Sequence, residues 1–144
     1  MVQARYAISA YKAARRTVPP LQAVVLLYDG AMGRIAKAAD AARRRDYETQ
    51  FNEARSAAEI FNGLDLCLDM TKGGGVALSL RDMYRAVCHA LMKSVGRTSG
   101  AECCDRLVAA IRLTRDAWAE IAGIARVPPV PDGADEPAAN RRAH

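Results

Sequence analysis

Clusters of helix-breaking residues divide this chain into segments, and within each segment the apolar residues recur at helical spacing. The breakers are TVPP at residues 17–20, TKGGG at residues 71–75 and GRTSG at residues 96–100. Proline lacks a backbone N–H and glycine is conformationally free, so a helix rarely continues through such clusters. The charged segment RRRDY adds a boundary, with Asp46 as the predicted N-cap of the helix that follows. The predicted helices cover about residues 19–44, 47 to the TKGGG segment, 76–95 and 101–125.

This division predicts an all-α fold, an antiparallel up-down four-helix bundle. Helices of roughly 20 to 26 residues are about 30 to 39 Å long, and the short connections between them force neighbouring helices to run antiparallel. Aromatic residues make up only 6% of the chain and alanine is abundant, a composition that favours helix over sheet. A chain of 144 residues fits one such domain.

The two ends of the chain are expected to lie outside the bundle. Residues 1–18 form a predicted N-terminal cap segment, with a short extra helix over residues 1–16 that TVPP separates from the first long helix. Residues 19–125 form the predicted bundle. Residues 126–144 contain four prolines and no apolar periodicity, so we expect a disordered tail that buries too little apolar area to offset its ordering entropy.

Apolar stripes indicate which side chains of the bundle point inward. Val76 and Ile121 belong to the stripes of the last two predicted helices and are expected in the core. The helix after Asp46 carries two adjoining stripes, one of which contains Ile60 and Leu64. Such a wide face can contact two neighbouring helices, or it can leave one stripe for a partner, so these two residues are either core or groove-lining.

Net charge is +5, but the distribution of charge argues against nucleic-acid binding. Residues 1–45 contain nine Lys or Arg and two Asp or Glu, whereas residues 46–69 contain one Arg and six Asp or Glu. If the two segments lie side by side as antiparallel helices, much of this imbalance is neutralised within the fold. No run approaches the ~18 apolar residues of a membrane span, no secretory leader is recognisable, and we expect a cytoplasmic protein.

The chain offers little that resembles catalytic or metal chemistry. Its four cysteines lack a CxxC spacing, and no nucleophile–base pairing is visible, so we expect no enzyme activity, no metal site and no cofactor. The glycines of TKGGG lack the Lys-Ser/Thr pair that follows the glycines of a P-loop. The alternative is a histidine phosphotransfer bundle that uses His89; those domains place a lysine at i+3 and a glycine at i+4, whereas Lys93 is at i+4 and Gly96 at i+7.

An ordered set of motifs resembles the flagellar secretion chaperone FliS family. The set begins with the tyrosine pair Tyr6 and Tyr11, continues with a proline before the first long helix, and ends with AWAEI at residues 117–121. The resemblance spans about residues 5–122. The central matches are Leu27, Tyr28, Asp29, Gly30 and Ala31, followed by Leu68, Asp69, Gly74, Gly75, Ala77, Leu80 and Tyr84.

The resemblance implies a cytoplasmic, ATP-independent chaperone that binds the C-terminal segment of flagellin. Such a chaperone prevents premature polymerisation of flagellin, delivers it to the flagellar type III export gate, and works as a monomer or homodimer without a cofactor. A segment that is disordered before assembly can fold along apolar grooves of a rigid bundle as it binds. The candidate partner-binding residues are Tyr6, Ile8, Tyr11, Tyr28, Asp29, Gly30, Ile60 and Leu64.

Two of the motifs carry a more detailed hypothesis. Tyr6, Ile8 and Tyr11 would belong to a movable cap that lies on apolar bundle surface also used by flagellin. Gly30 and Gly33 lie about one turn apart, where the missing side chains would allow a neighbouring helix or the cap to approach closely. Asp29 beside them would bond to the incoming segment.

Overall fold

The computed structural model describes residues 20–123, and these residues form four helices. The predicted cap segment, residues 1–18, and the predicted tail, residues 126–144, lie outside the described residues. The first helix begins at Pro20, which suits a first turn because its missing N–H would have no helical partner there. The helices are α2 (Pro20–Arg43), α3 (Tyr47–Leu66), α4 (Met70–Ser94) and α5 (Gly100–Ala122).

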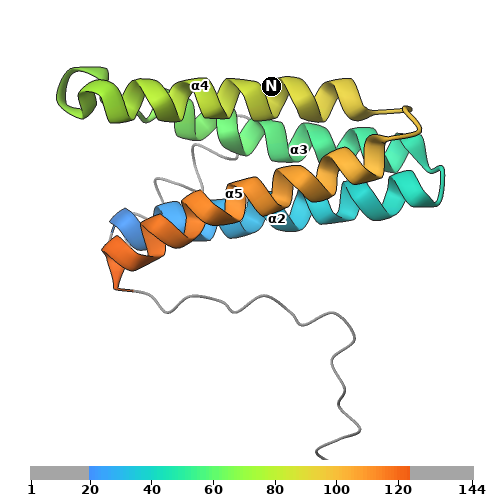
Figure 1. Ribbon diagram of the computed structural model, residues 1–144, viewed down its shortest axis with the longest axis horizontal. Helices are drawn as coiled ribbons and strands as arrows, with labels where there is room; N and C mark the ends of the chain where they lie inside the picture. Colours follow the sequence, from blue (N-terminus) through green and yellow to red (C-terminus); the bar gives the residue numbers. More distant parts are fainter. Residues whose placement is uncertain (1–19, 124–144) are drawn as a thin grey trace, which may run out of the picture.

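The four helices form an antiparallel up-down bundle, which confirms the predicted all-α fold. α2 packs along both α3 and α5, α3 packs against α4, and α4 touches α5 only lightly. Figure 1 shows why this last contact is weak: α4 and α5 are close where the turn between them joins them, and they diverge toward the opposite end of the molecule.

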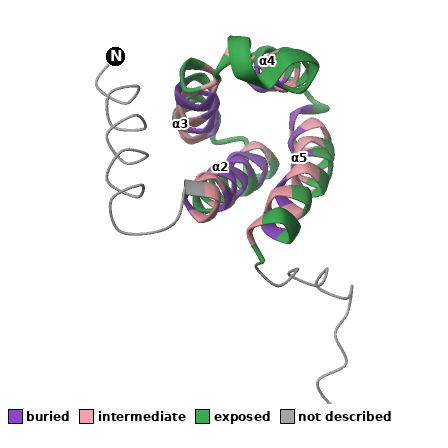
Figure 2. Cartoon of the chain, turned by 90° about the vertical axis from the view of Figure 1, so that its left-hand side faces the viewer, coloured by how far each residue is buried: buried purple, intermediate pink, exposed green. Residues whose placement is uncertain are grey.

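The core follows the inner face of α2. Tyr28 and Ile35 are fully buried on this helix, and Phe61 of α3, Leu91 of α4 and Ile111 of α5 pack into the same cluster. In Figure 2 the buried residues lie on the sides of the helices that face one another. Burial of a large apolar side chain contributes about 1.5 to 3 kcal/mol, so this cluster supplies the main stabilisation of the bundle.

Asp46 caps α3 as predicted. Its side chain accepts a hydrogen bond from the Thr49 N–H at 3.2 Å. Hydrogen bonding to the Thr49 side chain first, and to this N–H second, holds the pKa of the carboxyl group below its usual value. The cap satisfies one of the N–H groups that a helix start leaves unpaired. The end of α2 and the start of α3 were therefore readable from local chemistry.

The prediction for TKGGG is wrong in its position. α3 already ends at Leu66, and α4 begins at Met70, before the glycines. Asp69 accepts hydrogen bonds from the N–H groups of Thr71 and Lys72, and this cap starts the helix. The break expected from the glycines is confined to Gly74, whose φ of 52° and ψ of −132° kink α4 near its beginning. A strong N-cap thus forms one turn of helix ahead of the kink.

Val76 and Ile121 were expected to point inward, and this is wrong, because each is 68% exposed. The two residues belong to the parts of α4 and α5 that have diverged, and these two helices contact each other only lightly. Figure 2 shows the first part of α4 as largely exposed. The apolar spacing is helical, but the neighbouring helix is too far away to bury it.

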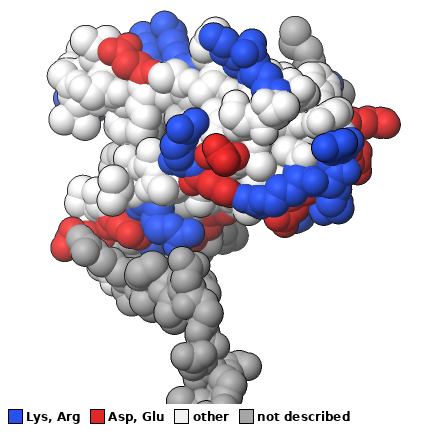
Figure 3. Space-filling view, turned by 45° about the vertical axis from the view of Figure 1, so that its right-hand side comes forward, with Lys and Arg blue, Asp and Glu red and all other residues white. Residues whose placement is uncertain are grey.

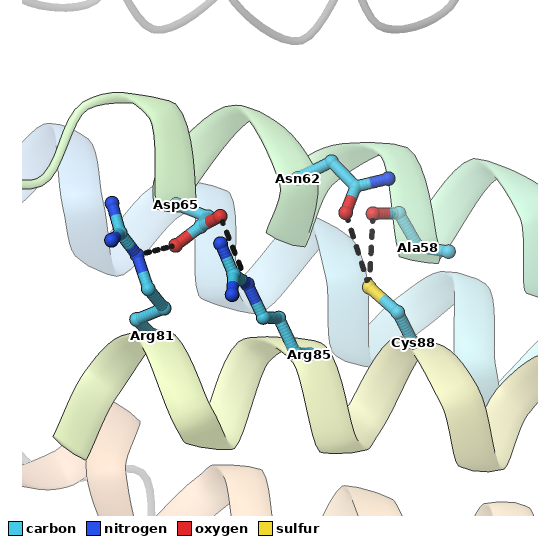
Figure 4. Close-up of polar contacts among 6 residues, drawn as sticks. All are labelled: Ala58, Asn62, Asp65, Arg81, Arg85 and Cys88. Carbon is cyan, nitrogen blue, oxygen red and sulfur yellow. Dashed lines mark hydrogen bonds and ion pairs between the residues drawn. The ribbon is translucent and has the colours of Figure 1, made fainter. Parts of the chain in front are cut away.

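Polar contacts hold α4 against α3. Figure 4 shows Asp65 of α3 between Arg81 and Arg85 of α4, with N···O distances of 3.1 and 3.7 Å. One turn farther along, the Cys88 thiol donates to the Ala58 carbonyl oxygen at 3.4 Å. Asp65 therefore neutralises cations of α4 rather than of α2.

The sequence predicts that acidic residues of α3 neutralise basic residues of α2, and within these two helices one ion pair does so. Arg34 of α2 contacts Glu53 of α3 at 3.2 Å. Both side chains are partly exposed, and a pair of this kind contributes at most about 1 kcal/mol. Its main consequence is to lower the local surplus of positive charge on α2.

Candidate functional site

The divergence of α4 from α5 leaves an apolar cleft at one end of the bundle, which we call the open-end cleft. Its volume is about 210 Å³, and all four helices and the α3–α4 turn contribute to its walls. Leucine, valine and tryptophan side chains dominate these walls. The lining residues are Leu21, Val24, Leu64, Cys67, Leu68, Asp69, Tyr84 and Trp118.

Three hydrogen-bonded aromatic residues form the inner end of the cleft. The hydroxyl groups of Tyr28 and Tyr84 lie 2.7 Å apart, and the indole N–H of Trp118 donates to the Tyr28 hydroxyl at 3.3 Å. Burial raises the pKa of the Tyr28 hydroxyl above its usual value, so the group stays protonated and keeps these bonds at neutral pH. This network joins α2, α4 and α5 at a fixed separation.

The ring of Phe61 packs against both tyrosines of this network. Its ring meets Tyr28 edge-on, with the ring centroids 6.1 Å apart, and lies 5.7 Å from the ring of Tyr84. Such contacts contribute about 0.5 to 1.5 kcal/mol each beyond the burial of their area. The inner end of the cleft is therefore packed and preorganised.

Exposed apolar residues that do not themselves line the cleft lie on the helices around it, and we call them the rim. Val76 on α4 and Ile121 on α5 stand on the two diverging helices, each 68% exposed, and Leu66 at the end of α3 is 70% exposed. Exposed apolar surface that continues into a cleft is typical of sites that bind other proteins. Within residues 20–123 we find no group of His, Cys, Asp or Glu side chains able to hold a metal ion. The apolar walls of the cleft are suited to binding apolar side chains of a partner.

Among the predicted site residues, Leu64 and Tyr28 lie at this cleft. Leu64 is both core and cleft-lining, since it is 5% exposed, and Tyr28 is fully buried behind the cleft, where it bonds to the lining residues Tyr84 and Trp118. Ile60 is half-buried and packs against the core. Gly30 is exposed and does not line the cleft. Tyr6, Ile8 and Tyr11 lie outside the described residues.

Asp29 is held by α5. Its two carboxylate oxygens accept hydrogen bonds from the Arg115 side chain at 2.8 and 3.2 Å. Arg115 is only 5% exposed and also contacts Asp116 at 3.3 Å. The hydrogen bond to Asp29 raises the pKa of the guanidinium group above its usual value. In the described residues Asp29 thus links α2 to α5.

The close-approach account of the two α2 glycines is wrong for the described helices. A Cβ added at Gly30 would lie 4.0 Å from the Ile60 Cδ1 atom, an ordinary van der Waals distance, and a Cβ added at Gly33 would meet nothing within 4 Å. Both glycines are exposed: Gly30 borders α3 at Ile60, and Gly33 lines a depression between α2 and α5. An approach of the predicted cap to these glycines would involve residues outside the described range.

Sequence reasoning missed Arg115 and the cleft itself. Arg115 occupies an inward position at helical spacing from Ile111 and Ala119, but a charged residue is not expected in a core. The burial of Arg115 could have been inferred from Asp29, an acidic residue of α2 that can form an ion pair with it. The cleft left no signal in the periodicity, because its depth depends on the angle between α4 and α5.

His89 is exposed on α4, and Lys93 and Gly96 follow it at i+4 and i+7 rather than at the spacing of the phosphotransfer alternative. The comparison with protein families decides the matter, because the family model described as Flagellar protein FliS matches residues 2–125. The chain belongs to the FliS family. FliS proteins are flagellar export chaperones that bind flagellin, and the family is not one of enzymes. A comparison with curated proteins gave no match.

Among the described helices, none combines the length and the hydropathy needed to cross a bilayer.

Proposed function

We propose that this chain binds the C-terminal segment of flagellin in the open-end cleft, prevents its premature polymerisation, and delivers it to the flagellar type III export apparatus. The observation that carries the proposal is the cleft itself, which is lined mainly by apolar side chains and lies between the two helices on which Val76 and Ile121 are exposed. The binding takes place in the bacterial cytosol and uses no cofactor.

The shape of the cleft suits a helix that forms on binding. α4 and α5 diverge around it, so an amphipathic segment can lay one apolar face between them, with side chains at i, i+3 and i+4 pointing inward. The client segment loses conformational entropy as it orders, and the apolar area that it buries offsets this loss. Tyr6, Ile8 and Tyr11 remain predicted contacts of a cap that competes for the same surface.

Isothermal titration of the full chain with a peptide of the flagellin C-terminal segment tests the proposal. We expect the rim substitutions Val76→Glu and Ile121→Glu each to weaken binding by about tenfold or more, since a carboxylate would be buried against apolar client surface. Both positions are exposed in the free protein, so the melting temperature should change little.

Leu113→Glu is the matched control. Leu113 is also an exposed aliphatic residue of α5, 76% exposed, but it lies about 140° around the helix from the lining residue Trp118, whereas Ile121 lies about 60° from it. We expect its affinity for the peptide to stay within about twofold of the original chain. Equal losses for Leu113→Glu and Ile121→Glu would show that the peptide binds apolar surface without selecting the cleft.

A further inference from the structure

The end of the bundle opposite the cleft contains a second depression, which we call the closed-end pocket. It lies between the α2–α3 turn and the α4–α5 turn and has a volume of about 380 Å³. Arginine side chains come to it from both turns. The lining residues are Ala42, Arg43, Arg45, Tyr47, Arg97, Thr98, Ala101 and Glu102.

Arg45 has a backbone conformation that an arginine rarely adopts. Its φ is 58°, in the left-handed region, and its N–H bonds to the Ala42 carbonyl oxygen while the Asp46 N–H bonds to that of Ala41. This is the position after a helix end where glycine is strongly preferred, because a Cβ is disfavoured there. Glycine would adopt this backbone conformation at lower cost than arginine. The turn itself therefore gives no reason for an arginine side chain at position 45.

The cations of the pocket exceed its acids. Neither Arg45 nor Arg97 forms an ion pair with a residue that the structure describes. Arg43 is partly neutralised, since it contacts Asp40 and Asp105. Among the lining residues Glu102 is the one acid, so two guanidinium groups remain available to an anion.

An exposed aromatic pair adjoins these cations. Tyr47 and Phe51 stand one turn apart at the start of α3, 42% and 39% exposed. Residues at i and i+4 share a helix face, so the two rings form one patch. A ligand for this surface needs a carboxylate beside an apolar group.

We propose that the closed-end pocket binds an acidic segment of a second protein. A carboxylate of that segment contacts Arg45 and Arg97, and a neighbouring apolar side chain packs on Tyr47 and Phe51. A nucleic acid fits less well, because its repeating phosphates need a basic track along the surface, whereas the lining cations without an ion pair among the described residues are Arg45 and Arg97 alone. Figure 3, in which this end of the bundle comes forward, shows acidic and basic side chains interspersed rather than one basic field.

This pocket is separate from the flagellin-binding cleft. The α2 helix alone has 24 residues and is therefore about 36 Å long, and the pocket and the cleft lie near its two ends. Both sites can be occupied at once. A client at one end thus leaves the other end free to contact a further protein.

The test uses fluorescence anisotropy at low salt with a labelled eight-residue peptide that contains four glutamates, one leucine and one phenylalanine. We expect Arg45→Gly to weaken peptide binding at least fivefold while it raises the melting temperature by about 2 to 5 °C, because glycine relieves the left-handed backbone. Arg97→Ala should weaken binding to a similar degree. Arg112→Ala, which removes the same charge from α5 outside the pocket, should change affinity by less than twofold.

The expected gain in stability separates loss of binding from loss of fold. The flagellin peptide should bind Arg45→Gly as it binds the original chain. The proposal is overturned if Arg45→Gly retains full affinity for the acidic peptide, or if a peptide with glutamines in place of the glutamates binds equally well. It is also overturned if a twelve-nucleotide single-stranded DNA binds more tightly than the acidic peptide.

Discussion

The two ends of the bundle show opposite ways of joining helices. At the closed end, the α4–α5 turn is tied to α3 by Gln50, which is fully buried. Its amide donates to the Ser94 carbonyl oxygen and accepts from the Gly96 N–H, both at 3.3 Å. Gly100 lies directly against the same carbonyl group, so α4 and α5 are held close together there.

Toward the open end, α4 and α5 share one direct hydrogen bond, from the Thr114 hydroxyl to the Met83 sulfur at 3.5 Å, and meet otherwise through Tyr28, which bonds to both helices. α4 starts with an exposed turn and a kink at Gly74, and its remaining attachments are the polar contacts to α3 and the buried Tyr84. The comparison shows how a four-helix bundle creates a binding surface: it fixes two helices at one end and lets them diverge at the other. The cleft is a consequence of where the ties are placed.

The largest effect is expected from filling the space at Gly100. A Cβ at this position would lie 2.6 Å from the Ser94 carbonyl oxygen and 3.0 Å from the Gln50 side-chain nitrogen. We expect Gly100→Ala to lower the free energy of unfolding by about 2 to 3 kcal/mol and the melting temperature by about 10 °C, because a backbone atom must move. Thermal unfolding followed by circular dichroism measures this.

Gly75 at the open end is the matched control. A Cβ added there meets nothing within 4 Å, and its φ is not in the left-handed region. Gly75→Ala should therefore stabilise the chain by about 0.5 to 1 kcal/mol through the higher helix propensity of alanine. If both substitutions destabilise equally, the two ends do not differ in packing as we describe.

The local parts of this architecture were predictable from sequence, and the angles between helices were not. The Asp46 cap and the boundaries of α2 depend on residues close together in the chain. The exposure of Val76 depends on how far α4 swings from α5, which the ties at the other end determine.

The candidate site shows the same limit. Leu64 was recognised as core or groove, and the structure places it at the cleft, but periodicity alone left both possibilities open. Arg115 was missed because its burial depends on a partner, Asp29, that lies 86 residues away in the sequence. Pattern reasoning assigns a side chain to a helix face, and only the packed structure shows what meets that face.

A smaller effect is expected at the aromatic network of the open end. Tyr28→Phe removes both the hydroxyl contact to Tyr84 and the acceptor for Trp118, so we expect it to cost about 1 to 2 kcal/mol, whereas Tyr84→Phe should cost about 1 kcal/mol. Chemical denaturation of the two variants measures the difference. A larger loss for Tyr84→Phe would mean that Tyr28 is not the centre of the network.

The same network predicts a dependence on alkaline pH. The pKa of Tyr28 is raised by burial, so its contribution to stability is complete below the unfolded value near 10 and is lost as pH rises through the folded value. The original chain should therefore lose stability more steeply above pH 10 than Tyr28→Phe does. Parallel slopes for the two proteins would contradict the assignment.

The last comparison uses the reactivity of the cysteine thiols and needs no substitution in the chain. Cys67 is exposed at the open-end cleft, whereas Cys88 is half-buried between α3 and α4 and Cys104 is fully buried. Burial, with the nearby Asp65 carboxylate, raises the pKa of Cys88 to about 11, so only about 0.1% of this thiol is ionised at pH 8. We expect iodoacetamide at pH 8 to modify Cys67 first and to leave Cys88 and Cys104 largely intact, as measured by peptide mass spectrometry over time.

The bound flagellin peptide should slow the reaction of Cys67 alone. Equal rates at Cys67 and Cys88 would show that α4 separates from α3 readily, and the open end would then extend along the whole helix.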